Sequence, residues 1–271
     1  MKLLVTNDDG VESPGLPPLV AAVAESGHDV VVVAPDRDMS GSAAAIGHLH
    51  VDKGIEATPV ELDGLAGIPA HAVDGPPGLC VLAARLGGFG EPPDVVVSGI
   101  NPGCNTGRAV LHSGTVGAAL TAANFGCRGL AVSLDISTRK ARGPAAEPQW
   151  ATAAAVAGSV LDWLLEAPAA TVLNVNVPNL PLDRLAGVRQ AALAPFGTVR
   201  ASVVEAAADG GQLQMELRPT ERELPPGSDT ALVAQGFVTV TPIAGIQAAA
   251  LDVSPILDAV DAVAVDARSS A

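Results

Sequence analysis

The sequence predicts an α/β protein in which helices cover both faces of a parallel sheet. Three observations lead to this prediction. Short apolar runs alternate with helical segments as far as residue 178, which is typical of repeated strand–helix–strand units. These runs, such as the valines of residues 30–33, have no polar face, as buried parallel strands require. Aromatic residues make up only 2% of the chain, and small aliphatic side chains suit closely packed layers.

The first predicted strand covers residues 2–6, and the helix after it covers residues 17–27, with prolines at its start and a glycine at its end. The alternation continues along the chain. Further strands are predicted at residues 28–35, 93–99, 129–134 and 170–178, and further helices at residues 76–88, 114–126 and 148–167. Residues 44–75 are predicted to form short strands and turns.

The pattern changes after about residue 185. Two strands within residues 198–219 flank the turn Asp209-Gly210-Gly211, which is a hairpin signal. A polar, proline-rich loop, a strand at residues 236–242 and a closing helix at residues 254–267 complete the prediction. We therefore expect a core at residues 1–185 and a C-terminal part at residues 186–271.

Composition excludes several classes of protein. The net charge is −14, from 15 Lys and Arg against 29 Asp and Glu, so a nucleic-acid duplex is not an expected partner. The three cysteines form no CxxC pair, which argues against a zinc site or a disulfide framework. The apolar start is soon interrupted by two aspartates, and the run at residues 151–161 is too short to span a bilayer. We expect a cytoplasmic protein that does not bind membranes.

Polar, glycine-containing loops follow three of the predicted strands. They are Asn7-Asp8-Asp9-Gly10, residues 34–42 (APDRDMSGS) and residues 98–107 (SGINPGCNTG). Ligands of open α/β sheets bind at the carboxyl ends of the strands, so these loops are expected to converge. The side-chain oxygens that they would bring together are those of Asp8, Asp9, Ser40, Ser42, Asn101 and Asn105. Such an all-oxygen set suits Mg²⁺ or Mn²⁺.

A fourth segment, Ser113-Gly114-Thr115, stands immediately before a predicted helix. The free N–H groups and positive dipole end of a helix N-terminus favour phosphate, and a metal beside phosphate indicates phosphoryl chemistry. Each motif also has a structural interpretation: Asp-Asp-Gly and Asn-Pro-Gly are common turns, and Ser113 or Thr115 could serve only as a helix N-cap. Their combination at successive strand ends favours the functional interpretation.

Five segments together resemble the SurE family of stationary-phase survival proteins. They are LLVTNDDGVESPG, VVAPDRDMSG, VVVSGINPGCNTG, HSGTVGAA and LNVNVP, in the order of the family. The resemblance implies a metal-dependent phosphatase that acts on nucleoside monophosphates, as a 5′- and 3′-nucleotidase. It also implies a Rossmann-like three-layer αβα core and a C-terminal β-hairpin that exchanges between the subunits of a homodimer or homotetramer.

The resemblance also implies site residues. The ligands of one divalent cation per subunit, Mg²⁺ or Mn²⁺, would be Asp8, Asp9, Ser40 and Asn101. The residues that bind the substrate and its phosphate would be Asn7, Ser40, Gly41, Asn101, Ser113, Gly114 and Thr115. The chain departs from the family where His112 replaces an aromatic residue and where residues 75–80 (GPPGLC) replace a Thr-Pro-Ala-Asp-Cys segment. His112 could act as a general acid or could fill a structural position, which we favour.

In the expected reaction Asp8 and Asp9 are the catalytic residues. One of them, for which we favour Asp9, would orient or deprotonate the attacking water, and a covalent aspartyl-phosphate on Asp8 is the alternative. Two other functions stay open: a metal or nucleotide sensor without turnover, and a dinucleotide-dependent oxidoreductase. The oxidoreductase is disfavoured because the first strand is not followed by a GxGxxG turn.

Overall fold

The computed structural model describes residues 1–47, 54–136, 147–195, 199–205, 214–219, 223–246, 250 and 252. The strands are β1 (Lys2–Thr6), β2 (Asp29–Pro35), β3 (Ala57–Val60), β4 (Ala70–Val73), β5 (Val95–Pro102), β6 (Arg128–Asp135), β7 (Val172–Pro178), β8 (Val188–Gln190), β9 (Val199–Glu205), β10 (Gln214–Pro219) and β11 (Val238–Pro242). The α-helices are α1 (Leu16–Ala24), α2 (Pro77–Arg85), α3 (Gly114–Asn124), α4 (Trp150–Glu166) and α5 (Asp229–Ala234), and two 3₁₀ helices are η1 (Gly107–His112) and η3 (Leu182–Arg184).

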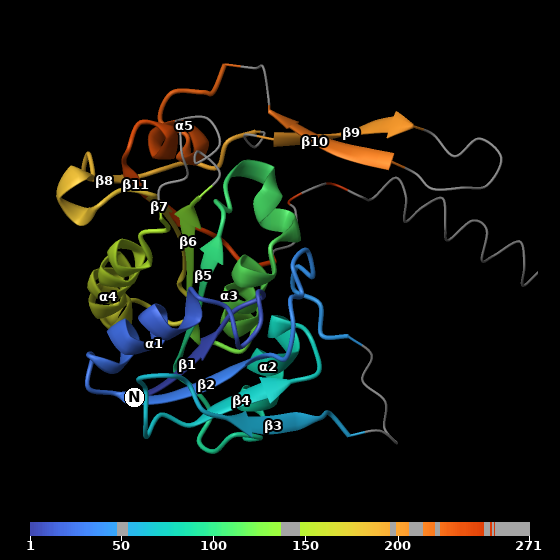
Figure 1. Cartoon of the computed structure of the whole chain (residues 1–271), viewed down its shortest axis with the longest axis vertical. Coiled ribbons are helices and arrows are strands. Elements are labelled where there is room, and N and C mark those ends of the chain that lie inside the picture. Colours follow the sequence, from blue (N-terminus) through green and yellow to red (C-terminus); the bar gives the residue numbers. More distant parts are fainter. Residues whose placement is uncertain are drawn as a thin grey trace, which may run out of the picture.

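The described strands confirm the predicted α/β class. Nine of them form one sheet in the order β3-β4-β2-β1-β5-β6-β7-β11-β8, with helices on both faces (Figure 1). The five central strands from β2 to β7 are parallel. Alternate residues of these strands face opposite layers: Leu3 and Val5 pack in the core beneath α1 and α4, whereas Leu4 packs in the core beneath α2 and α3.

The order of the strands reverses at β1. This strand pairs with β2 on one side, which follows it directly through α1, and with β5 on the other side. A crevice opens at such a reversal, outside the carboxyl ends of the strands, and ligands of open α/β sheets bind there. Because Thr6 pairs with Ser98 in register, the segments after β1 and at the end of β5 lie side by side.

Four elements were not predicted from the sequence: β8, α5 and the two 3₁₀ helices η1 and η3. β8 is a three-residue, exposed edge strand, and α5 packs against β11 and β7 in the C-terminal part of the chain. β11 was predicted as a strand, but its place could not be: it pairs antiparallel with β7 and parallel with β8. The sheet thus continues beyond residue 185, where we placed the boundary between the two parts, and that boundary stays a prediction.

β9 and β10 pair antiparallel in a separate two-stranded sheet, which extends away from the nine-stranded sheet (Figure 1). These are the two strands expected within residues 198–219. The expected turn at Asp209-Gly210-Gly211 and the closing helix at residues 254–267 lie outside the described residues. Within the described part of the chain, none of the helices has the length and apolar character that crossing a membrane requires.

Candidate active site

The segment after β1 packs directly against the segment after β2. Gly10 has a φ of +92°, and a Cβ at this position would lie 2.9 Å from the carbonyl carbon of Arg37, so a larger residue would push the two segments apart. Backbone hydrogen bonds hold them together: Val11 N–H donates to Pro35 O (2.8 Å) and Met39 N–H donates to Asp8 O (2.7 Å). The loop with Ser40 is therefore fixed beside Asp8.

Asp8 is buried, with 3% of its surface exposed, and its carboxylate meets the N-terminus of α3. Oδ2 accepts the Gly114 N–H at 3.1 Å, and Oδ1 accepts the hydroxyl of Thr115. The positive end of the helix dipole favours a negative charge here. Burial nevertheless raises the pKa of Asp8 above its ordinary value, although these hydrogen bonds act to lower it.

Thr115 connects Asp8 to the end of β5. Its hydroxyl also approaches Asn101 Oδ1 at 3.3 Å, while the Asn101 amide nitrogen donates to Gly103 O at 2.6 Å. The structure therefore brings three of the expected site residues, Asp8, Asn101 and Thr115, into one group, together with the backbone of Gly114. They come from the ends of β1 and β5 and from the start of α3.

Asp9 differs from Asp8 in having a buried oxygen that is not used. Its Oδ2 is inaccessible to solvent and has no hydrogen-bond partner among the described residues. Burial, first, and the negative charges of Asp8 and Asp38 raise the pKa of Asp9 to about 7. Asp38 was not selected in the sequence analysis. Its position in the sequence, two residues before Ser40, was the signal that could have identified it. In the structure its carboxylate accepts the Ser40 N–H at 2.8 Å.

Ser40 and Gly41 are exposed on the loop after β2, and Ser42 lies deeper. The hydroxyl of Ser42 is buried and has no partner among the described residues. It lies 2.6 Å from the position that a Cβ on Gly114 would take, and Asp8 Oδ2 lies 2.8 Å from the same position. Ser42 and Asp8 therefore both pack closely against Gly114, and a side chain at this position would clash with them.

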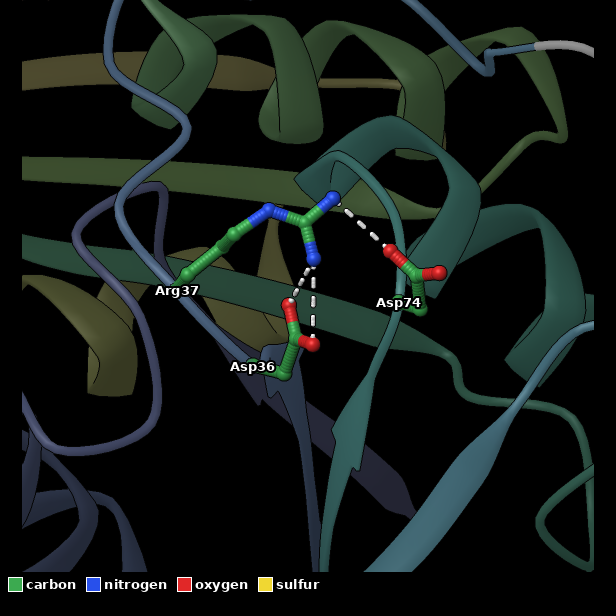
Figure 2. Close-up of polar contacts among 3 residues, drawn as sticks. All are labelled: Asp36, Arg37 and Asp74. Atoms are coloured by element: carbon green, nitrogen blue, oxygen red, sulfur yellow. Dashed lines mark hydrogen bonds and ion pairs between the residues drawn. The ribbon is translucent and has the colours of Figure 1, made fainter.

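The start of this loop is held by an exposed cation. The Arg37 guanidinium lies between two carboxylates, at 2.8 Å from Asp36 and 2.8 Å from Asp74 (Figure 2). Asp36 follows β2 and Asp74 follows β4, so Arg37 joins the carboxyl ends of two neighbouring strands. Exposed ion pairs stabilise a fold only slightly, and we interpret this one as orienting the loop that leads to Ser40.

Three further residues of the sequence motifs have structural partners. Ser113 is the N-cap of α3, and its hydroxyl oxygen accepts the Val116 N–H at 3.1 Å. Asn7 donates to Gly10 O at 2.8 Å, but its Oδ1 is buried without a partner among the described residues. Asn105 bonds to Asn176 on β7 and to Ser133 on β6. His112 is exposed at the end of η1.

The donor set fits a hard divalent cation. Three of the buried oxygens that have no partner among the described residues, Asn7 Oδ1, Asp9 Oδ2 and Ser42 Oγ, belong to the segments after β1 and β2. The raised pKa values of Asp8 and Asp9 show that two negative charges are costly here in the absence of a counter-ion. Among the described residues no three His, Cys, Asp or Glu side chains are grouped to hold a metal, so amide, hydroxyl or water oxygens must complete its coordination.

Comparison with known proteins identifies the family of this chain. The family model described as "Survival protein SurE" matches residues 3–199. The 5′-nucleotidase SurE of Aeromonas hydrophila is 36% identical over 247 residues, covering 90% of this chain and 92% of that protein. The 5′/3′-nucleotidase SurE of Shigella dysenteriae is 36% identical over 246 residues, covering 90% of each.

The fold agrees as well. The crystal structure of the SurE protein from Aquifex aeolicus matches with a TM-score of 0.74 and 27% sequence identity, over 96% of this chain and all of that one. The family model covers more than half of the chain, including every motif residue assigned above. The chain belongs to the SurE family.

Proposed function

We propose that this protein is a divalent-metal-dependent phosphatase that hydrolyses nucleoside monophosphates to nucleoside and phosphate. The observation that carries the proposal is the pair of adjacent carboxylates at the strand reversal, one anchored to the N-terminus of α3 and the other with an unused oxygen. Two relatives that share 36% of their residues with this chain are named 5′-nucleotidase and 5′/3′-nucleotidase. This supports phosphate-ester hydrolysis over a dinucleotide-dependent oxidoreductase.

One divalent cation per subunit, Mg²⁺ or Mn²⁺, would be held by Asp8, Asp9, Ser40 and Asn101. The carboxylate and amide oxygens among these match the preference of both ions for oxygen ligands. When bound, such a cation draws negative charge from the phosphoryl group and so favours attack at phosphorus. Ser40 is exposed and contributes a neutral hydroxyl, which water can replace, so we expect it to matter least of the four.

The phosphate would bind at the start of α3, beside the two carboxylates. Gly114 and Thr115 lie at the positive end of the helix dipole, and the absence of a side chain at Gly114 lets Ser42 and Asp8 approach the start of the helix closely. Ser113, Asn7 and Gly41 complete the expected set. We add Ser42 to it, because a buried hydroxyl without a partner is costly and a phosphate oxygen would satisfy it.

The two aspartates have different roles in this proposal. Both oxygens of Asp8 accept hydrogen bonds, from Gly114 and Thr115, so this carboxylate is held in one orientation. Asp9 keeps an oxygen free to accept a proton from the attacking water. This difference favours Asp9 as the general base, and a covalent phosphate on Asp8 is the second candidate because Asp8 is the better oriented of the two.

The decisive experiment measures phosphate release from AMP and GMP with Mn²⁺ or Mg²⁺, with and without EDTA. We expect turnover that EDTA abolishes and that either added ion restores. Binding of nucleotide and metal without turnover would favour the sensor, and release that is unaffected by EDTA would refute the metal. Quenching with acid during turnover distinguishes general-base catalysis by Asp9 from a covalent phosphate on Asp8. Only the covalent intermediate leaves phosphate bound to the protein.

We also propose that the protein is a homodimer or homotetramer, with the hairpin of β9 and β10 at an interface between copies. A two-stranded sheet is marginally stable alone in water, and the described part of this hairpin is separate from the main sheet. Deleting residues 198–219 is expected to shift light-scattering mass towards the monomer, and an unchanged mass would contradict the proposal. A cytoplasmic location stays a prediction.

A further inference from the structure

The segment between β5 and η1, residues 103–106, is held by polar side chains that take no part in the proposed chemistry. Two of them are Asn174 and Asn176 on β7, which are fully buried. They alternate with Val175 and Val177, whose side chains pack in the core on the other face of the sheet. A buried amide is costly unless it is hydrogen-bonded, so the partners of these two indicate their purpose.

The partner of both amides is the backbone of Asn105. The Asn105 N–H donates to Asn176 Oδ1 at 2.8 Å, and the Asn105 carbonyl accepts from Asn174 Nδ2 at 2.7 Å and from Asn176 Nδ2 at 3.1 Å. The side chain of Asn105 donates to Ser133 Oγ on β6 at 3.0 Å. Asn174 Oδ1 has no partner among the described residues. One loop residue is thus fixed through its backbone and its side chain by two strands.

A carboxylate from the C-terminal part holds the next residues of the same segment. Asp229, at the start of α5, is fully buried. Its Oδ2 accepts the Gly107 N–H at 2.8 Å, and its Oδ1 accepts the N–H groups of Ala194 (2.9 Å) and Thr230 (2.7 Å). Hydrogen bonds from N–H groups to a carboxylate are stronger than those between neutral groups. The link joins positions 122 residues apart.

This segment connects two parts of the proposed metal and phosphate site. Asn101 precedes it, and η1 and then α3, with Gly114 and Thr115, follow it. Asn101, Ser133 and Asn176 are also neighbours in register across β5, β6 and β7. A displacement of residues 103–107 would therefore move both Asn101 and the start of α3 relative to Asp8.

We propose that Ser133, Asn174, Asn176 and Asp229 form a polar clamp whose role is to position Asn101 and the N-terminus of α3 against Asp8. The four are positioning residues, since their bonds are to the chain and not to the reacting groups. The effect on turnover rests on the function proposed above, whereas the effect on structure does not. Removing residues that orient metal ligands commonly lowers metal affinity or activity by about 10- to 100-fold, and we expect the clamp to fall in this range.

The test uses the full-length protein and three substitutions of graded severity. Asn176→Ala removes an acceptor and a donor for Asn105, Asp229→Asn places an amide donor among N–H groups, and Ser133→Ala removes a single acceptor. Leu161→Ala in α4 is the control, because it opens a cavity in the buried core on the other face of the sheet. If Asn176→Ala fails to fold, Ser133→Ala, which removes only one acceptor, serves as the test.

The first measurement is hydrogen–deuterium exchange without metal, over peptides that cover residues 103–117. We expect the clamp variants to exchange faster at residues 113–117, where the Gly114 N–H binds Asp8. Leu161→Ala should not exchange faster there, even when its melting temperature falls by the same amount. The second is titration with Mn²⁺ alone, with an affinity about 10- to 100-fold weaker in Asn176→Ala and a smaller loss in Ser133→Ala.

Unchanged exchange at residues 113–117 in every folded clamp variant would overturn the proposal, whatever the activity. Equal increases in exchange and equal losses of Mn²⁺ affinity in the clamp variants and in Leu161→Ala would also overturn it. The clamp would then act only as a part of the fold. If the wild-type protein neither binds Mn²⁺ nor hydrolyses nucleotides, the proposed function fails, but the exchange result still decides whether the clamp positions α3 against Asp8.

Discussion

Asp9 and Asp229 both lie at the carboxyl-end side of the sheet, yet their surroundings are opposite. Both oxygens of Asp229 accept backbone N–H groups, from Gly107, Ala194 and Thr230. Asp9 has two like charges nearby, on Asp8 and Asp38, and one oxygen with no partner among the described residues. The first carboxylate completes a structure, and the second is suited to a ligand that brings positive charge.

The same contrast separates Asn176 from Asn7. Both ends of the Asn176 amide are bonded to Asn105, whereas Asn7 uses its nitrogen and leaves Oδ1 buried without a described partner. Burial is the same for both residues, at 0% exposure, so burial alone does not tell a ligand from a scaffold residue. Asn176 and Asn7 differ in whether the described part of the chain already satisfies both ends of the side-chain amide.

The largest expected effect comes from the two adjacent carboxylates, Asp8 and Asp9. Asp8→Asn or Asp9→Asn removes a charged ligand, and we expect the rate of phosphate release to fall by several orders of magnitude at saturating Mn²⁺ while the fold survives. Asp29→Asn is the control, because this exposed carboxylate lies at the start of β2, at the opposite end of the sheet. Near-normal turnover in either Asp8 or Asp9 variant would remove it from the site.

Gly114→Ala tests the close contact that Ser42 and Asp8 make with the start of α3. Its Cβ would lie 2.7 Å from Asp8 Cβ and 2.6 Å from Ser42 Oγ, so the carboxylate or the helix must move. We expect a loss of kcat/KM on the order of a hundredfold, as for other small misplacements of reacting groups.

Gly158→Ala in the middle of α4 is the matched control for Gly114→Ala. The nearest atom to its Cβ is 4.0 Å away, and alanine favours a helix over glycine by about 0.5–1 kcal/mol. Its activity should therefore be unchanged and its melting temperature equal or higher. If both glycine variants have the same activity, the close approach of Asp8 to Gly114 has no function.

Replacing Asp9 and replacing Asp229 should change the free energy of unfolding in opposite directions. In the metal-free protein at neutral pH, Asp9→Asn relieves repulsion with Asp8 and Asp38, so the free energy of unfolding should rise. Asp229→Asn leaves N–H groups facing an amide and should lower it, by about 1–3 kcal/mol. Urea denaturation in EDTA measures both. A loss of stability in Asp9→Asn would contradict the electrostatic interpretation.

The pH dependence follows from the raised pKa of Asp9. Its folded value of about 7 exceeds the ordinary 3.8, so the metal-free folded state binds more protons than the unfolded state between these values. Stability should therefore fall as pH rises from about 4 to about 7, and the raised pKa of Asp8 acts in the same direction. Thermal unfolding at pH 5 and pH 8 measures this. The decrease in melting temperature between the two pH values should be smaller in Asp9→Asn, and in wild type with Mn²⁺, than in the metal-free wild-type protein.

Ser113→Ala has the smallest expected effect. The hydroxyl caps α3, and losing an N-cap costs about 0.5–2 kcal/mol of stability. If Ser113 also binds phosphate, KM for AMP should rise by about ten- to a hundredfold, and inhibition by inorganic phosphate should weaken by the same factor. If only the melting temperature changes, Ser113 belongs with the satisfied residues and leaves the phosphate set.

The sequence by itself determined the sheet class and the approximate positions of its central strands. Apolar runs such as residues 2–6 and 28–35 are local patterns, and a buried parallel strand is the interpretation that fits them best. Because ligands bind where such strands end, the position of the two aspartates after β1 was enough to select them. Three exposed residues carry no such pattern, so β8 was missed.

Only the tertiary structure decided which polar residues meet. Thr115 joins Asp8 and Asn101, Ser42 faces Gly114, and Asp229 holds Gly107 across 122 residues of sequence. Asn105 looked like a ligand beside Asn101, yet its bonds are to β6 and β7. The physical reason is that a hydrogen bond depends on distance and direction to within a few tenths of an ångström. Such precision comes from the packed fold and leaves no trace in residue spacing.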